Sequence, residues 1–239
     1  MPEPLRVLEL EPYCGGSHAA VLQGLRAHSA HAVEVWSMPA RKWKWRMRAA
    51  ALTMADRIAA EAPRFDVLFA SDFLDLAAFA GLRPELARVP KVAYFHENQL
   101  TYPLQDESQR DYHYGFTNVT TCLAADRVLF NSRYHRDSFL AAVPDFIRRM
   151  PDHQPARVSE RIAGRSEVVY PGVETADLAA ARLRRGRPSG PLTILWNHRW
   201  EYDKAPEAFF NVLFALADEG ADFRVCVLGQ RFRDAPPVF

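Results

Sequence analysis

The sequence is poor in cysteine and has no long apolar run. Its three cysteines, Cys14, Cys122 and Cys226, are too few and too scattered for a disulfide framework or a zinc site. No apolar stretch approaches the ~20 residues of a membrane helix, and the N-terminus has acids and prolines where a secretion signal has basic and apolar residues. These absences predict a soluble, cytoplasmic protein with no membrane partner.

Two nucleotide-binding signatures and a strong net charge are also missing. There is no Walker lysine loop, and the glycine pair Gly15–Gly16 lacks the three-glycine spacing of a dinucleotide fold, so nucleotide hydrolysis and hydride transfer are disfavoured. The net charge of +1 gives no global attraction for nucleic acid, so any such contact needs a local patch. Because no spacing of metal ligands is evident, we expect metal-independent chemistry and no cofactor.

Apolar runs alternate with helical patterns along the chain. The runs predict strands at 5–10, 32–36, 66–70, 91–95, 127–130 and 167–170. The patterns between them predict helices at 17–27, 48–61, 73–80, 108–125 and 133–147. Such alternation indicates an α/β domain, 1–172, built on a doubly wound parallel sheet with helices on both faces.

The composition changes after residue 172. Between Pro171 and Pro191 the composition becomes basic and rich in proline and glycine, which predicts a linker at 173–190. Beyond it, a strand at 192–196, a helix at 206–218 and a strand at 223–228 restart the alternation in a second domain, 191–239. Two strands and one helix do not cover both faces of a parallel sheet, so we expect this second domain to be truncated.

Polar residues follow the ends of the predicted strands, where an open α/β sheet binds its ligands. His96 and Glu97 follow the strand at 91–95, and a glycine turn follows the first strand, where the next helix could present its N–H groups to a phosphate. A strand cap beside a solvated carboxylate is the alternative for His96 and Glu97, but the recurrence of polar strand ends favours a site. The other candidates at this edge are Gly15, Gly16, Ser17, Asn98, Tyr102 and Asn131.

Two further clusters carry positive charge. One combines four cations with two indoles, a mixture that grips phosphates while its rings stack on unpaired bases or on a sugar, so RNA is the partner it fits. Its members are Arg41, Lys42, Trp43, Lys44, Trp45 and Arg46. A solvated helix start with one tryptophan in the core is the alternative. In the second domain, His198, Arg199 and Lys204 surround a strand-to-helix turn where both cations could reach one pyrophosphate, with salt bridges to nearby acids as the alternative.

These residues stand in motifs that run in order through nearly the whole chain. The sequence resembles the tRNA-queuosine mannosyltransferases, GT-B class proteins within a large family of retaining glycosyltransferases. The matching stretches are 13–18 (YCGGSH), 39–46 (PARKWKWR), 94–103 (YFHENQLTYP), 131–132 (NS), 151–155 (PDHQP) and 198–204 (HRWEYDK).

The resemblance implies two Rossmann-like domains, the first on the acceptor side and the second binding the nucleotide sugar. It implies GDP-mannose as donor and the queuosine wobble nucleoside of tRNA-Asp as acceptor. It places His96 in the sugar pocket, lets Gly15 and Gly16 approach the donor, and assigns neutralisation of the departing diphosphate to Arg199 and Lys204 without a metal. It does not require Glu97 as a nucleophile.

The family's later glutamate pair, which holds the donor sugar and the ribose, is expected beyond Phe239, so the 239-residue chain alone is expected to lack part of the donor site. Two alternatives stay open: transfer to a lipid or glycan acceptor, and a non-catalytic RNA-binding module.

Overall fold

The structure is a computed structural model that describes residues 3–175, 178, 181, 190–231 and 236–239. The chain divides into two compact units, Met1–Tyr102 with Arg110–Gly172, and Pro103–Gln109 with Val173–Phe239. The second unit thus includes 103–109, which the sequence analysis had assigned to the first domain. Most of the expected linker, at 176–177, 179–180 and 182–189, lies outside the described residues.

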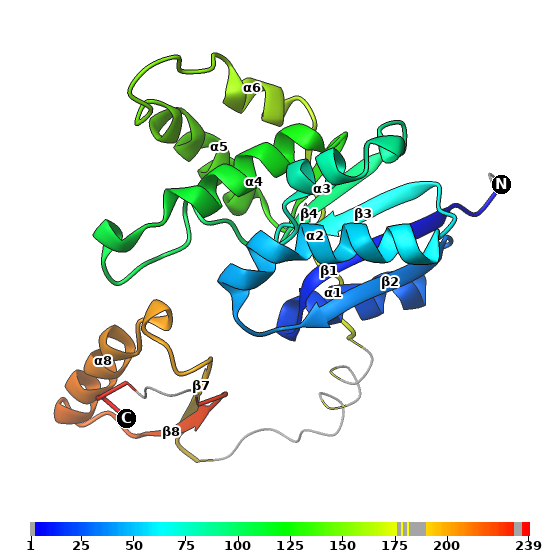
Figure 1. The fold of residues 1–239 in the computed structure, drawn as a ribbon. Coiled ribbons are helices and arrows are strands. Elements are labelled where there is room, and N and C mark those ends of the chain that lie inside the picture. The colour runs from blue at the N-terminus through cyan, green and yellow to red at the C-terminus, as the bar shows by residue number, and fades with distance from the viewer. Residues whose placement is uncertain (1–2, 176–177, 179–180, 182–189, 232–235) are drawn as a thin grey trace. The chain divides into compact units, whose positions relative to one another are not determined.

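The first unit is built on a parallel sheet with the strand order β2-β1-β3-β4-β5-β6 (Figure 1). The strands are β1 Arg6–Cys14, β2 Ala32–Pro39, β3 Val67–Ser71, β4 Lys91–Phe95, β5 Arg127–Phe130 and β6 Ser166–Val168. The chain leaves β1 toward β2 on one side and returns to β3 on the other, which makes β1 and β3 the switch point of the sheet. Ligands of open α/β sheets bind at the carboxyl ends of the strands at such a point.

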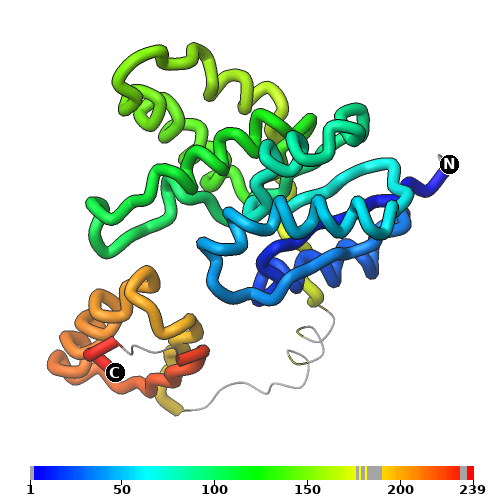
Figure 2. The backbone as a smooth tube through the Cα atoms, viewed as in Figure 1, coloured from blue at the N-terminus to red at the C-terminus, as the bar shows by residue number. Residues whose placement is uncertain are grey.

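Helices cover this sheet, and the expected doubly wound α/β architecture is confirmed. They are α1 Gly16–His28, α2 Trp43–Glu61, α3 Leu76–Leu82, the 3-10 turn η1 Pro84–Leu86, α4 Tyr112–Ala124, α5 Arg133–Ile147 and α6 Val158–Ala163. Successive side chains of β1 point to opposite faces of the sheet. Leu8 and Leu10 pack into the main core with α2, α3, α4 and α5, whereas Glu11 meets His18 of α1 on the opposite face. The backbone tube shows α2, α3 and α4 following one another over the first face (Figure 2).

Three helices begin more than one residue from their predicted starts, and side-chain caps give the reason for two of them. The side chain of Asp75 accepts the N–H of Ala78, so α3 starts at Leu76 and not at 73. Asp111 accepts the N–H of His113, so α4 starts at Tyr112 and not at 108. Helix α2 starts earlier than expected, at Trp43. Its first turn therefore contains most of residues 41–46, the cationic tryptophan segment. Helix α6 was not predicted.

The second unit contains the parallel pair β7 Leu192–Asn197 and β8 Phe223–Leu228, joined through η3 Tyr202–Lys204 and α8 Pro206–Asp218; η2 Glu107–Gln109 belongs to the same unit. Trp196 packs with two residues of α8 to form its small core. Four apolar strand residues are exposed among the residues described for this unit: Leu192, Leu195, Val225 and Leu228. Across the described ranges of the whole chain, no helix has the length and apolar character needed to cross a bilayer.

Candidate functional site

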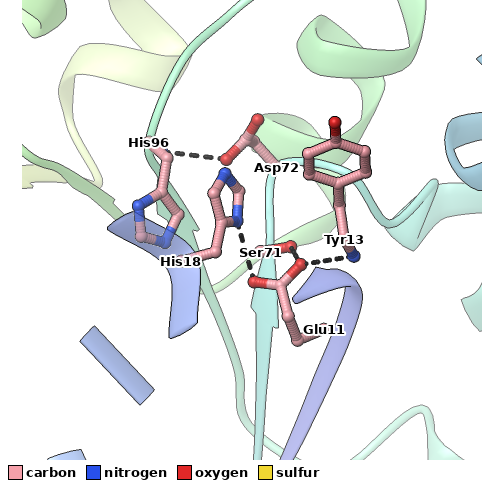
Figure 3. A network of polar contacts seen from close by, with 6 residues as sticks. All are labelled: Glu11, Tyr13, His18, Ser71, Asp72 and His96. Carbon is pink, nitrogen blue, oxygen red and sulfur yellow. Dashed lines mark hydrogen bonds and ion pairs between the residues drawn. The ribbon is translucent and has the colours of Figure 1, made fainter. Parts of the chain in front are cut away.

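A buried polar network stands at the carboxyl ends of β1, β3 and β4 (Figure 3). Its centre is Glu11, whose side chain is fully buried. The carboxylate accepts the backbone N–H of Tyr13 at 2.7 Å and the hydroxyl of Ser71 at 3.0 Å, and it pairs with Nδ1 of His18 at 2.9 Å. One acid therefore ties the end of β1 to the end of β3 and to the first turn of α1.

The imidazole of His18 connects this acid to His96. The two rings stack with centroids 3.8 Å apart and planes 24° apart, and Figure 3 shows them side by side. The ring of Tyr94 meets His96 edge-on at 4.8 Å. Below the rings, the carboxylate of Asp72 accepts the backbone N–H of His96 at 2.8 Å. No hydrogen bond joins the ring nitrogens of His96 to another described residue, so the ring can address a ligand.

Burial and neighbouring charges shift the pKa values of the two histidines in opposite directions. Burial opposes protonation of His18, but the hydrogen bond to Glu11 and the charges of Asp72, Glu11 and Glu97 outweigh it and raise the pKa of His18. Burial, the charge of His18 and that of His135 lower the pKa of His96 to about 3. At neutral pH, His96 is therefore a neutral imidazole with one N–H donor and one acceptor nitrogen.

Burial raises the pKa of two carboxyl groups near this pair. Burial and the nearby charge of Glu11 raise the pKa of Glu9 to about 8, although His18 opposes this shift. Burial is also the main cause that raises the pKa of Asp72 to about 8. The site thus concentrates shifted groups in the way active sites do.

Glu11, His18 and His96 offer ligand atoms within 4.8 Å of one another and are the described residues that could approach a shared metal ion. Their arrangement does not fit one. A histidine binds a metal along the lone pair in its ring plane, and two rings stacked at 3.8 Å aim these lone pairs along nearly parallel planes. Glu11 is also occupied by three donors or partners. The geometry favours a hydrogen-bonding and electrostatic site.

The segment after His96 is held by its own side chains and by α4. Asn98, predicted as an acceptor contact, is 3% exposed and turns its Oδ1 toward the N–H groups of Leu100 and Thr101. Asn118 of α4 accepts the N–H of Gln99 at 2.7 Å. The guanidinium of Arg110 donates a hydrogen bond to the backbone carbonyl of Tyr102 at 3.0 Å. In the structure, Asn98 therefore shapes the loop.

Asn131, also predicted as an acceptor contact, supports the same loop from β5. Its amide donates to the carbonyl of His96 at 2.8 Å, and its Oδ1 lies 3.0 Å from Nδ1 of His135. His135 packs edge-on against Phe130, and its Nε2 has no hydrogen-bond partner among the described residues. Asn131 thus fixes the backbone on which His96 and Glu97 stand. Glu97 itself accepts a hydrogen bond from Gln99 at 3.3 Å.

The glycine turn before α1 has two different glycines. A Cβ on Gly15 would lie 2.5 Å from the Cβ of Ala40, so this glycine allows the chain after β2 to approach. Gly16 has φ +52°, a left-handed conformation that favours glycine, with open space where a Cβ would be. Ser17 is exposed on the first turn of α1. Open space at Gly16 and Ser17 is compatible with the predicted donor contact, whereas the close approach at Gly15 is made within the protein.

The cationic tryptophan segment places its two indoles in different environments. Trp43 packs against Tyr114 with centroids 4.9 Å apart, and Lys44 lies over the same two rings. Trp45 is 72% exposed. Arg41 and Lys42 are exposed as well, whereas Arg46 is partly buried and donates to the carbonyl of Pro39. Trp43 therefore packs against the small cluster of Met47, Phe73 and Tyr114, whereas Trp45 stands among cations on the surface, and the RNA contact stays a prediction.

In the second unit, both predicted phosphate-binding cations contact acids. Arg199 pairs with Glu201 at 3.1 Å and Lys204 with Asp203 at 2.7 Å. The ring of His198 packs edge-on against Trp196. These ion pairs agree with the salt-bridge alternative, and a donor diphosphate would have to compete with the two carboxylates.

Sequence reasoning missed the buried members of the site. His18 belongs to the motif at 13–18, but the sequence pattern assigned it no role. Glu11 and Asp72 were not among the predicted site residues. The available signal was a pair of glutamates, Glu9 and Glu11, at alternate positions of an otherwise apolar strand. A buried acid on a strand needs a partner, and that requirement points to a nearby base.

Comparisons with known proteins show the family of this chain. Residues 6–173 match the family model described as tRNA-queuosine alpha-mannosyltransferase N-terminal. A curated tRNA-queuosine alpha-mannosyltransferase of Drosophila melanogaster is 39% identical over 246 residues, which cover 98% of this chain and 63% of that protein. The chain thus spans just under two thirds of the length of this relative.

Two solved structures share the fold. An alpha,alpha-trehalose-phosphate synthase (UDP-forming) from Burkholderia vietnamiensis has a TM-score of 0.58 at 15% identity, over 97% of this chain and 65% of that chain. An alpha,alpha-trehalose 6-phosphate synthase from Burkholderia multivorans has a TM-score of 0.53 at 17% identity, over 95% of this chain and 65% of that chain. At these identities the similarity concerns the fold alone.

Proposed function

Because the chain belongs to the tRNA-queuosine alpha-mannosyltransferase family, we propose that the protein is a retaining glycosyltransferase that transfers mannose from GDP-mannose to the queuosine wobble nucleoside of tRNA-Asp. Its fold class is the expected α/β architecture of GT-B type. The observation that supports the catalytic part of the proposal is His96, a neutral imidazole with unoccupied ring nitrogens at the switch point of the sheet.

For this transfer, the main requirement on the first unit is a hydrogen-bonding group next to the sugar. In a retaining transfer the bond between the anomeric carbon and the donor phosphate breaks, GDP leaves with the electron pair, and the acceptor hydroxyl attacks from the same face and loses its proton. His96 would bind a mannose hydroxyl and strengthen that bond as positive charge develops on the ring. Glu97 would favour the same positive charge through space.

The leaving group and the acceptor need cations. We assign the diphosphate to Arg199 and Lys204, which would neutralise it without a metal, and His198 to the same donor site. We assign the tRNA to the surface around Trp45, where an exposed indole stands among four cations. A tRNA acceptor is consistent with a cytoplasmic enzyme.

The catalytic role is tested by His96→Ala in the intact natural protein. Removing a hydrogen bond that strengthens in the transition state should lower kcat by about 10²- to 10³-fold. The donor Kd should change far less, because the ground state uses that bond weakly. His28→Ala, at an exposed histidine of α1, is the matched control. Unchanged turnover in the His96 variant would return this residue to a structural role.

The RNA contact is tested by neutralising the cations around Trp45. Each lost phosphate contact should reduce the slope of log affinity against log salt by roughly 0.7 to 0.9. The test variant replaces Arg41, Lys42, Lys44 and Arg46 with glutamine. The control variant makes the same change at four exposed arginines near the amino ends of the strands, namely Arg26, Arg64, Arg88 and Arg127. Equal slopes for the two variants would refute a specific RNA surface.

The two tryptophans provide a second, independent test. Trp45→Ala should weaken tRNA binding by ~1–3 kcal/mol, the value of one stacked base, with no loss of fold stability. Trp43→Ala should destabilise the first unit instead, because this indole packs against Tyr114. If both variants kept an unchanged, donor-dependent activity on a lipid or glycan, the acceptor would be of that class and not a tRNA. Binding of tRNA without any transfer would favour a non-catalytic RNA-binding module.

A further inference from the structure

His18 is buried between Glu11 and His96 and has no role in the transfer described above. We propose that His18, anchored by Glu11, is a positioning residue that fixes the imidazole of His96 in its working orientation, an inference that rests on the proposed function of His96. The two side chains come from α1 and from the segment after β4, which lie far apart in the sequence. Their contact is therefore made by the fold.

The anchor of His18 is rigid because Glu11 is itself held from three directions. Two donors from the protein, the N–H of Tyr13 and the hydroxyl of Ser71, fix the carboxylate that pairs with Nδ1 of His18. The ring of Phe73 meets His18 edge-on at 5.3 Å. With its edge bound to Glu11 and its surroundings packed, the imidazole of His18 has little freedom to rotate.

The ring of His96 is confined on two sides by groups that are themselves fixed. His18 stacks on its face at 3.8 Å, and Tyr94 meets it edge-on at 4.8 Å while donating its hydroxyl to the carbonyl of Val169. The backbone of His96 is bound at its N–H by Asp72 and at its carbonyl by Asn131. Within this frame, His18 covers one face of the ring.

Burial keeps His96 neutral, and the charge of the stacked His18 adds to this effect. A second positive charge in face contact with a protonated His18 is unfavourable, so the proton resides on His18, next to Glu11. The charged or titratable groups that face the pair are Glu9, Glu11 and Tyr13 of β1, Asp72 after β3, Tyr94 of β4, Glu97 after β4 and His135 of α5. A neutral His96 keeps both a donor and an acceptor nitrogen for the sugar hydroxyls.

Two substitutions at His18 distinguish the effect of its ring contact on His96 from the effect of its positive charge. His18→Ala removes both, and a ring that is free to move should lower kcat by up to about 10²-fold while the donor KM changes by less than ~3-fold. His18→Phe keeps an aromatic face without the charge. It should retain kcat within ~5-fold near neutral pH, and the acid limb of its kcat profile should move to higher pH because His96 becomes easier to protonate.

Titration of the histidine rings by NMR measures the pKa values of His18 and His96 in the absence of substrate. In the His18→Phe protein, the pKa of His96 should be higher than in the wild type, and Glu11→Gln should shift the pKa of His18 downward. These shifts remain measurable if mannose transfer fails, so failure of the proposed function is distinguishable from failure of the positioning role. Near-UV circular dichroism checks that each variant is folded.

Three results would overturn the inference. An unchanged kcat in folded His18→Ala would show that the stack does not position His96. A rise in donor KM with constant kcat would make His18 a direct donor contact. Activity of the wild type that is lost with a chelator and restored by zinc would show that Glu11, His18 and His96 bind a metal. Loss of kcat in His18→Ala with recovery in His18→Phe supports the proposal.

Discussion

The buried carboxyl group of Glu9 should make the stability of the first unit depend on pH in a direction opposite to that of an ordinary salt-bridged acid. Glu9 is 2% exposed, and one of its carboxyl oxygens has no hydrogen-bond partner among the described residues. Its pKa rises from 4.5 to about 8 on folding, mainly through burial. The folded state therefore keeps a proton that the unfolded chain releases above pH 4.5.

The sign and size of the effect follow from this difference. The stabilising contribution is fully present below pH 4.5 and is lost as the pH rises toward 8. His96 and His135 act in the opposite sense below pH 6.5, because their folded pKa values are about 3 and about 4. Between pH 6.5 and 8, where these two histidines no longer titrate, Glu9 should reduce the free energy of unfolding by ~2 kcal/mol, at about 1.36 kcal/mol for each pH unit.

Glu9→Gln removes this titration while keeping the shape of the neutral side chain. Asp72, whose pKa rises to about 8, and His18, whose pKa is raised from 6.5, contribute losses of the same sign in both proteins, so the variant should lose less stability than the wild type between pH 6.5 and 8. Urea unfolding followed by far-UV circular dichroism at four pH values in this window measures the slopes. Glu160→Gln, at an exposed carboxylate of α6, is the control. Parallel slopes for wild type and Glu9→Gln would refute a protonated Glu9.

Two further predictions concern the frame of the site. Gly15→Ala should destabilise the first unit by ~1–3 kcal/mol, because its Cβ would lie 2.5 Å from that of Ala40, whereas Gly24→Ala, in open space within α1, should stabilise it by ~0.5–1 kcal/mol. Thermal unfolding of the two variants compares them, and equal Tm values would contradict the steric argument. Asn118→Ala should cost ~1–3 kcal/mol and expose the amide of Gln99 to faster hydrogen exchange, because this buried side chain accepts that N–H. Thr120→Ala, whose hydroxyl bonds only carbonyls of α4, is the control, and unchanged exchange at Gln99 would remove the role of Asn118.

Much of the scaffold was determined by local patterns in the sequence. The apolar runs and the helical periodicity were enough to predict the parallel α/β sheet, because strand and helix periods differ and each is recorded in consecutive residues. The same reasoning placed His96 at a strand end, and that position is confirmed by β4 ending at Phe95. The starts of α3 and α4 were predicted a few residues early, since the choice among nearby caps depends on which side chain reaches a free N–H.

The tertiary structure decided which residues meet. Glu11, His18 and His96 lie on three elements that become neighbours only when β1, β3 and β4 align at the switch point, and no spacing along the chain encodes a stack of two rings. It also separated Trp43, which packs on Tyr114, from Trp45, which stays exposed two residues later. Periodicity records the face of an element that is buried, but the identity of the partner depends on contacts between segments that are distant in sequence. For that reason, the local sequence specified the strands and helices, whereas the folded chain created the protonation states and orientations of the site.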